Sequence, residues 1–305
     1  MANEGDLGRA EPSPATPESP SALAPNSLAP GLYVTATPIG HARDVTLRAL
    51  DVLKGCDVIA AEDTRVTSKL LAIYGIAKPL VAYNDHNAAR ERPRLLTRLK
   101  AGQSVALVSD AGTPLVSDPG FKLVREAIAE DVRVEAIPGA SALLTALVLA
   151  GLPSDRFLFA GFLPPRSGER RNALAELKAI PASLVFFESP NRLGESLADM
   201  ADILGPRTAA VGRELTKLHE EIRRGTLVEL ASSYVDEDTP RGEVTIVVGP
   251  PPDEAPDAAR IDSLLRQALP FMPVRAAADL VAEALDTPRR GVYARALELK
   301  AETDA

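Results

Sequence analysis

Short apolar runs alternate with segments of helical periodicity from residue 31 onward. An apolar run at Leu32–Ala36 is followed by a polar loop, by an amphipathic segment at Thr46–Lys54 and by a second apolar run at Asp57–Ala61. The cycle repeats, and it predicts further strands at 79–82, 105–108 and 132–137 and further helices at 68–74, 88–101 and 121–129. Strands and helices that alternate with short connections form a parallel sheet covered on both faces. The pattern therefore predicts an N-terminal α/β domain over residues 30–141.

A second series of the same kind follows an apolar helix expected at Ala142–Ala150, which we interpret as the bridge between two domains. Its predicted strands are 157–162, 183–187, 208–213 and 243–248, and its predicted helices are 169–179, 193–204 and 227–233. These elements predict a second α/β domain over residues 142–250. A Pro-rich and acidic linker is expected over residues 251–258.

Three short helices are expected in the last segment, residues 259–305. Their predicted ranges are 259–269, 274–285 and 288–299, with Thr287 suited to cap the third helix and Pro288 suited to its first position. Arg289 and Arg290 lie at the start of this basic helix, as in helix-turn-helix modules that bind nucleic acid. A helical appendix that only packs against the rest of the protein is the alternative.

Composition narrows the class of protein. Of the 305 residues, 46% are hydrophobic and 25% are charged, as in globular proteins, and no apolar run is long enough to span a membrane. We therefore expect a cytoplasmic protein. Residues 1–29 are rich in Pro, Ser, Ala and Glu and are expected to form a disordered tail. The single cysteine, Cys56, excludes an internal disulfide and a Cys-rich metal site, and the net charge of −8 argues against a surface that is basic throughout.

Five polar loops follow predicted strands directly: 37–40, 61–65, 109–120, 187–192 and 212–216. Ligands bind at the carboxyl ends of strands in open α/β sheets, so we expect the loops to converge on one cleft between the domains. Asp110 and Asp118 in the third loop favour a cationic or hydroxyl-rich ligand over a phosphate, although an ordinary strand-to-helix turn is the alternative. The glycine motifs of dinucleotide-dependent dehydrogenases and of P-loop NTPases are absent, which disfavours both classes.

Six motifs recur in the order of a known family. They are Thr35-Ala-Thr-Pro-Ile-Gly40, Ala61-Glu-Asp-Thr-Arg65, Ser109-Asp-Ala-Gly-Thr-Pro114, Pro138-Gly-Ala-Ser141, Phe187-Glu-Ser-Pro190 and Gly212-Arg-Glu-Leu-Thr216. Together they resemble the tetrapyrrole methylase superfamily, and most closely its members that methylate bacterial ribosomal RNA. The resemblance extends over residues 31 to 300.

The resemblance implies two α/β domains with S-adenosylmethionine in the cleft between them, a small C-terminal helix-turn-helix-like module, and a homodimer. It implies 16S rRNA in the small ribosomal subunit as the substrate, with the methyl group placed on the ribose 2′-hydroxyl of a cytidine in the decoding region. No metal is expected. The cofactor contacts that the resemblance implies are Pro38, Asp110, Ala111, Gly112, Thr113, Pro114, Ser117, Asp118, Gly139, Ser141, Ala142, Phe187, Glu188, Arg213, Glu214, Leu215, Thr216, Gly242, Glu243 and Val244.

The sequence leaves open which group activates the hydroxyl. The candidates for the base are Glu62, Asp63, His86 and Glu188. Arg65 completes the expected catalytic set with Glu62 and His86, since an arginine can hold an RNA phosphate while an acid orients the hydroxyl. A helix cap with an ion pair and a surface histidine are the plain alternatives. Local basic patches predict RNA contacts at Arg92, Arg94, Arg170, Arg171, Arg289 and Arg290.

Two other functions fit part of the pattern. A tetrapyrrole or other small-molecule methylase would share the fold, but the basic helical module argues against it. A non-catalytic nucleic-acid-binding protein would share the basic patches, but the intact loops at 110–114 and 213–216 argue against it. We therefore expect an S-adenosylmethionine-dependent rRNA (cytidine-2′-O-)-methyltransferase.

Overall fold

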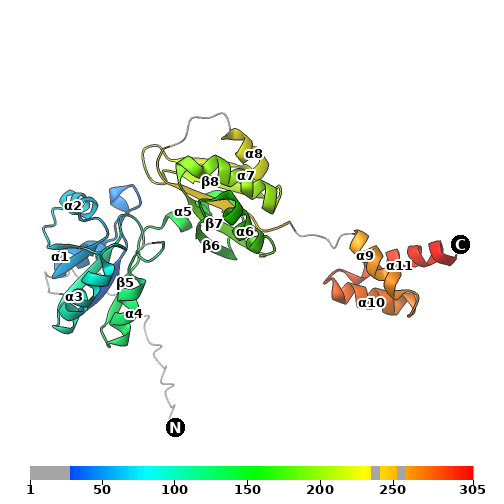
Figure 1. The fold of residues 1–305 in the computed structure, drawn as a ribbon, viewed down its shortest axis with the longest axis horizontal. Coiled ribbons are helices and arrows are strands. Elements are labelled where there is room, and N and C mark those ends of the chain that lie inside the picture. The colour runs from blue at the N-terminus through cyan, green and yellow to red at the C-terminus, as the bar shows by residue number, and fades with distance from the viewer. Residues whose placement is uncertain (1–27, 118, 235–240, 253–257, 305) are drawn as a thin grey trace, which may run out of the picture. The chain divides into compact units, whose positions relative to one another are not determined.

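The computed structural model describes residues 28–117, 119–234, 241–252 and 258–304. The chain forms two compact units that divide between Ser141 and Ala142, and each is described by itself (Figure 1). Within the described ranges, every helix is too short or too polar to cross a membrane.

The first unit is built on a parallel sheet with the strand order β3-β2-β4-β1-β5. Its strands are β1 (Gly31–Thr35), β2 (Val58–Ala61), β3 (Leu80–Ala82), β4 (Ser104–Val108) and β5 (Val134–Ile137), and its helices are α1 (Leu47–Gly55), α2 (Thr64–Ile73), α3 (Ala88–Lys100) and α4 (Phe121–Ala129), with a 3-10 turn η1 (Ala42–Asp44). Leu32 and Tyr33 are neighbours in β1, and their side chains pack into two different hydrophobic clusters. Successive side chains of a strand point to opposite faces of the sheet. Both faces of the sheet are therefore buried, as the strand–helix alternation predicts.

Helix α2 begins at Thr64, whereas the apolar pattern predicts a start at Ser68. Its N-cap is Asp63, whose carboxylate accepts the N–H of Arg65 at 2.8 Å. The first turn of the helix is polar except for Val66, so hydrophobic periodicity does not detect it. The early start places Glu62 and Asp63 between the end of β2 and the N-terminus of α2.

The second unit contains a mixed sheet with the strand order β6-β7-β10-β8-β9. Its strands are β6 (Phe157–Phe162), β7 (Ser183–Glu188), β8 (Thr208–Arg213), β9 (Glu221–Thr226) and β10 (Val244–Val248), and its helices are α5 (Ala142–Ala150), α6 (Ser167–Leu177), α7 (Leu193–Leu204) and α8 (Leu227–Ser233), with a 3-10 turn η2 (Pro190–Arg192). Strand β9 is missing from the sequence prediction. Its sequence, Glu-Ile-Arg-Arg-Gly-Thr, is mostly polar, and an edge strand needs little apolar surface.

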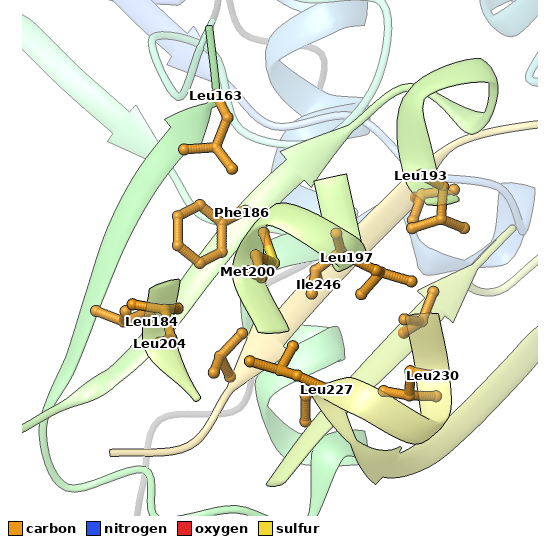
Figure 2. Close-up of a cluster of buried hydrophobic side chains, with 14 of the residues drawn as sticks. Leu163, Leu184, Phe186, Leu193, Leu197, Met200, Leu204, Leu227, Leu230 and Ile246 are labelled. Carbon is orange, nitrogen blue, oxygen red and sulfur yellow. The ribbon is translucent and has the colours of Figure 1, made fainter. Parts of the chain in front are cut away.

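The core of the second unit lies between its sheet and helices α6, α7 and α8. Phe186 of β7 and Ile246 of β10 lie beside Leu197 and Met200 of α7, and all four side chains are fully buried (Figure 2). Burial of each such side chain contributes about 1.5–3 kcal/mol. Helix α5 contacts β8 and β10. This packing fixes the strand ends on which the candidate motifs lie.

The C-terminal segment is a small three-helix module, α9 (Ala258–Ala268), α10 (Val274–Ala284) and α11 (Arg289–Asp304). Its core includes Leu265, Val281 and Val292, which are almost completely buried. Helix α11 starts at Arg289, after Pro288, and extends beyond the predicted end at Leu299. Together with the two α/β sheets, these helices confirm the predicted fold class.

Candidate functional site

The loops that follow β1 and β4 in the first unit are bonded to each other. Thr37 N–H donates to the carbonyl oxygen of Gly112 at 2.8 Å, and Gly112 N–H donates to the carbonyl oxygen of Thr37 at 3.1 Å. Gly112 has a φ of +77°, and an added Cβ would lie 3.3 Å from Ile39 Cγ2, so the position favours glycine. This bridge holds Pro38 beside the loop Asp110–Pro114.

The turn after β5 lies against the same loops. Thr113 Oγ1 donates to the carbonyl oxygen of Ala140 at 3.3 Å, and a Cβ added to Gly139 would lie 2.8 Å from Ala36 Cβ. The strands β4, β1 and β5 are adjacent, so their carboxyl ends bring together most of the cofactor contacts expected in this unit: Pro38, Asp110, Ala111, Gly112, Thr113, Pro114, Gly139 and Ser141. Ser117 has a φ of +65°, and Asp118 lies outside the described residues.

A pocket of about 410 Å³ lies where β2, β3 and β4 end. All three expected catalytic residues line it. The full lining is Glu62, Asp63, Thr64, Arg65, Ala82, Asn84, Asp85, His86 and Asp110. Asn84 and Asp85 are missing from the residues predicted for the site, which include His86, although all three lie in one polar run directly after a predicted strand.

Hydrogen bonds between side chains and backbone link the three strand ends around this pocket. Asp110 Oδ1 accepts the N–H of Asp63 at 2.9 Å, and Glu62 Oε2 accepts the N–H of Asp110 at 3.3 Å. Asn84 Nδ2 donates to the carbonyl oxygen of Glu62 at 3.3 Å. Among the described residues, Glu62 and Asp110 each use one carboxylate oxygen in these bonds, which leaves the other oxygen to accept a further hydrogen bond.

The interior of the pocket is acidic. Burial raises the pKa of Glu62, and the charges of Asp110, Asp85 and Asp63 raise this pKa further. Burial also raises the pKa of the Asp110 carboxyl. Such an interior favours hydrogen-bond donors and disfavours phosphate.

The rim of the pocket carries a cation. Arg65 Nη2 lies 2.6 Å from Asp63 Oδ2, and hydrogen bonding to Arg65 lowers the pKa of Asp63 to about 2. The Arg65 side chain nevertheless stays 86% exposed. Its guanidinium group is therefore oriented by Asp63 and still accessible to a phosphate.

In the second unit, strand pairing brings three motifs to one end of the sheet. Val244, the first residue of β10, pairs with Glu188 at the end of β7 on one side and with Arg213 at the end of β8 on the other. Most of the cofactor contacts expected in this unit therefore lie together: Phe187, Glu188, Arg213, Glu214, Leu215, Thr216, Gly242, Glu243 and Val244. Ala142 is the first residue of α5, which contacts β8 and β10.

Hydrogen bonds and ion pairs join the loop after β8 to the segment before β10. We call the residues involved the Glu214 clasp: Glu214, Lys217, Gly242 and Glu243. Glu214 Oε1 accepts the N–H of Glu243 at 3.1 Å, and Lys217 Nζ lies 2.7 Å from Glu214 Oε1 and 3.0 Å from Glu243 Oε2. Glu214 has a φ of +50° and Gly242 a φ of +101°. Lys217 is missing from the residues predicted for the site. The one feature of the sequence that points to it is its position three residues after Glu214.

Glu188 is directed into the second unit. Its side chain is 1% exposed, and its carboxylate accepts hydrogen bonds from Ser189 N–H at 2.7 Å, Ser196 Oγ at 2.6 Å and Arg192 Nη2 at 3.1 Å. These bonds fix the turn after β7. The ring of Phe187, the preceding residue, contacts the Phe159 ring with a centroid distance of 4.8 Å.

The expected RNA contacts differ in their exposure. Arg170 is predicted at a basic surface, whereas its side chain is 1% exposed and its Nε lies 2.6 Å from Asp199. We therefore leave Arg170 out of the RNA contacts, because its charge is used inside the second unit. Arg171 is 39% exposed and pairs with the same carboxylate. Arg92 is 18% exposed and pairs with Glu126, so we leave it out of the RNA contacts as well.

The remaining candidates lie at the surface. The Arg94 side chain is 68% exposed and pairs with Glu91. Arg289 is half-exposed and pairs with Asp279. Arg290 is exposed, and the described part of the chain shows no ion pair for it. The start of α11 therefore offers a guanidinium group to a partner.

Comparison with known proteins identifies the family. Residues 31–231 match the family described as Tetrapyrrole (Corrin/Porphyrin) Methylases. The chain belongs to this family. In this tetrapyrrole methylase family member, residues 255–300 also match the RsmI C-terminal HTH domain. The match covers α9, α10 and α11 as far as Lys300. The resemblance seen in the sequence is thereby confirmed.

Curated relatives match the chain over nearly their whole length. A protein of Mesorhizobium japonicum named Ribosomal RNA small subunit methyltransferase I is 54% identical over 274 residues, which are 90% of this chain and 93% of that protein. A protein of Pseudomonas aeruginosa with the same name is 45% identical over 272 residues, 88% of this chain and 96% of that protein.

Two solved structures share the fold of this chain. Uroporphyrin-III-C-methyltransferase from Thermus thermophilus aligns with a TM-score of 0.53 and 23% identity, over 72% of this chain and 93% of that chain. Diphthine synthase aligns with a TM-score of 0.56 and 19% identity, over 72% of this chain and 89% of that chain. At these identities the similarity concerns the fold alone.

Proposed function

We propose that this protein is an S-adenosylmethionine-dependent methyltransferase that acts on small-subunit ribosomal RNA. The observation that carries the proposal is the 54% identity, over 90% of the chain, to a protein named Ribosomal RNA small subunit methyltransferase I. The match of the C-terminal helices to the RsmI C-terminal HTH domain supports it, because that match extends past the methylase family's own range. The specific acceptor that we propose is the ribose 2′-hydroxyl of a cytidine in the decoding region of 16S rRNA.

The described residues fit S-adenosylmethionine, which supplies a methyl group already activated by a sulfonium. In the first unit, the exposed Asp110 carboxylate keeps one oxygen for a cationic group, and the exposed backbone of Gly139 offers hydrogen bonds. In the second unit, the exposed backbone of Gly242 lies beside the start of β10. We propose that the two sets of expected contacts, one from each unit, bind the cofactor. The cleft expected between the domains stays a prediction.

The acceptor side of the reaction is assigned to the pocket around Glu62, Arg65 and His86. In the transfer, a bond forms between the ribose O2′ and the methyl carbon, the bond from that carbon to sulfur breaks, and the hydroxyl proton leaves to a base. His86 is exposed in the pocket, and an imidazole is the most common protein group that accepts such a proton. Arg65 at the rim holds a neighbouring phosphate, and Glu62 contacts the target nucleotide.

Three further features belong to the proposal. The residues that contact RNA are Arg94, Arg171, Arg289 and Arg290. The C-terminal module is the main RNA-binding part, because it matches an HTH domain. The protein works as a homodimer, as the family resemblance implies, and light scattering tests this. It works in the cytoplasm, where bacterial ribosomal subunits are assembled.

The proposed function is tested with purified protein, radiolabelled S-adenosylmethionine and small ribosomal subunits that lack the modification. Label should appear in a 2′-O-methylated cytidine after digestion of the rRNA. His86→Ala should lower the rate by about 100-fold or more, whereas the matched control His219→Ala, which removes an exposed histidine of the second unit, should not. In a parallel incubation with a tetrapyrrole acceptor, label on the tetrapyrrole and none on rRNA would show a small-molecule methylase. Binding of rRNA without any label would show a non-catalytic binding protein.

A further inference from the structure

The pocket in the first unit differs from a phosphate site in the groups that line it. Its volume of about 410 Å³ falls in the range of small-molecule sites. Four of its residues are carboxylates, Glu62, Asp63, Asp85 and Asp110, and one of them is neutralised by the arginine at the rim. The carboxylates therefore favour a ligand that presents hydrogen-bond donors to them.

Two acceptor oxygens at this pocket have no hydrogen-bond partner among the described residues. Glu62 Oε2 is used by the Asp110 N–H, so Glu62 Oε1 remains. Asn84 Oδ1 is buried and has no hydrogen-bond partner among the described residues, while Nδ2 of the same side chain donates to the Glu62 backbone. A buried acceptor without a partner costs about 1–3 kcal/mol, and a donor supplied by a ligand would remove that cost once the Asn84 side chain turns its Oδ1 toward the pocket.

We propose that this pocket holds the target base and that Glu62 and Asn84 select cytosine over uracil. Cytosine carries an exocyclic amino group whose two N–H bonds can be accepted by two oxygens. Uracil has a carbonyl oxygen at that position and a single ring N–H between two carbonyl oxygens, so it would place acceptors against acceptors. The two pyrimidines have the same size, and the difference in their hydrogen-bonding edges decides between them.

This inference rests on the proposed function and deepens it, because it assigns the nucleotide preference to two side chains. It also assigns each part of the target nucleotide to a different group of the pocket. Arg65 at the rim is suited to a phosphate, His86 to the ribose hydroxyl, and Glu62 with Asn84 to the base. Glu62 is in this view a specificity residue.

The experiment compares methyl transfer to small ribosomal subunits reconstituted with cytidine or with uridine at the target position. The wild type should prefer cytidine by about tenfold or more in kcat/KM, as expected for a well-made contact to a base edge. Glu62→Gln keeps the shape of the side chain but replaces an acceptor by a donor that suits the uracil oxygen, so the preference should fall at least fivefold, about 1 kcal/mol. Glu130→Gln is the matched control, because it makes the same change at an exposed ion pair with Lys100.

Asn84→Ala gives an independent test, since it removes the second acceptor and leaves the Glu62 carboxylate in place. It should also lower the preference for cytidine. Thermal unfolding and the Kd of S-adenosylmethionine, measured for each variant, show that the compared proteins are folded and loaded. An unchanged cytidine-to-uridine ratio in both variants, or no preference in the wild type, would overturn the assignment of the pocket. Absence of rRNA methylation by the wild type would instead overturn the proposed function.

Discussion

Gly242 is a position where an added methyl group should break the Glu214 clasp. An alanine Cβ there would lie 2.3 Å from both Cδ and Oε1 of Glu214, far closer than atoms approach without movement. The Glu214 carboxylate would have to move away, and its bonds to the Glu243 N–H and to Lys217 would be lost. Gly242→Ala should therefore disturb both loops.

The expected loss of stability has two parts. The φ of +101° at Gly242 disfavours any side chain, which costs about 1–2 kcal/mol. Loss of the two Glu214 contacts costs about 1–3 kcal/mol more. Gly151→Ala is the matched control, because Gly151 has a φ of +69° and nothing within 4 Å of an added Cβ. Gly151→Ala should therefore lower the free energy of unfolding only by the cost of the backbone conformation.

Urea unfolding of both variants measures the difference, and a mutant cycle with Glu214→Ala isolates its cause. In the Glu214→Ala background the clash is absent, so Gly242→Ala should cost no more than the control. The affinity for S-adenosylmethionine, measured by calorimetry, should fall for Gly242→Ala and stay unchanged for Gly151→Ala. Equal losses of stability for the two glycine variants, or a full loss in the Glu214→Ala background, would refute the reasoning.

Three further predictions follow from charged side chains. Arg170→Met should lower the free energy of unfolding by about 1.5–3 kcal/mol, because the buried Asp199 carboxylate loses its 2.6 Å bond to Arg170 and keeps Arg171 and Ser167 as partners. Arg171→Met at a 39% exposed position should lower it by about 1 kcal/mol or less in the same denaturation assay. Arg65→Ala should raise the pKa of Asp63 from about 2 toward its ordinary value of 3.8 in a carboxyl NMR titration, and an unmoved pKa would contradict the role of the ion pair. Because burial raises the pKa of Glu62, the folded protein binds the proton of the Glu62 carboxyl more tightly than the unfolded chain does. Stability therefore falls as the pH rises from the ordinary value of 4.5 through the raised pKa of the folded protein. Glu62→Gln should remove this pH dependence and raise stability at neutral pH, and an unaltered pH profile of stability would argue against it.

Local patterns predicted much of the candidate site. The motifs around Glu62, Asp110 and Arg213 could be recognised because polar residues directly follow apolar strands, and strand ends are where open α/β sheets bind ligands. The partners of these residues could not be predicted in the same way. Lys217 and Asn84 became visible only through contacts that the fold creates.

The sequence by itself determined the two α/β units, the C-terminal helices and the family, because apolar periodicity and short motifs are local properties of the chain. Tertiary structure decided which residues meet and which charges reach the surface. The pairing of Val244 with both Glu188 and Arg213 depends on the antiparallel register of β10, and the burial of Arg170 depends on the packing of α6 against α7. Register and burial join residues that are distant in the chain, and no local pattern encodes them.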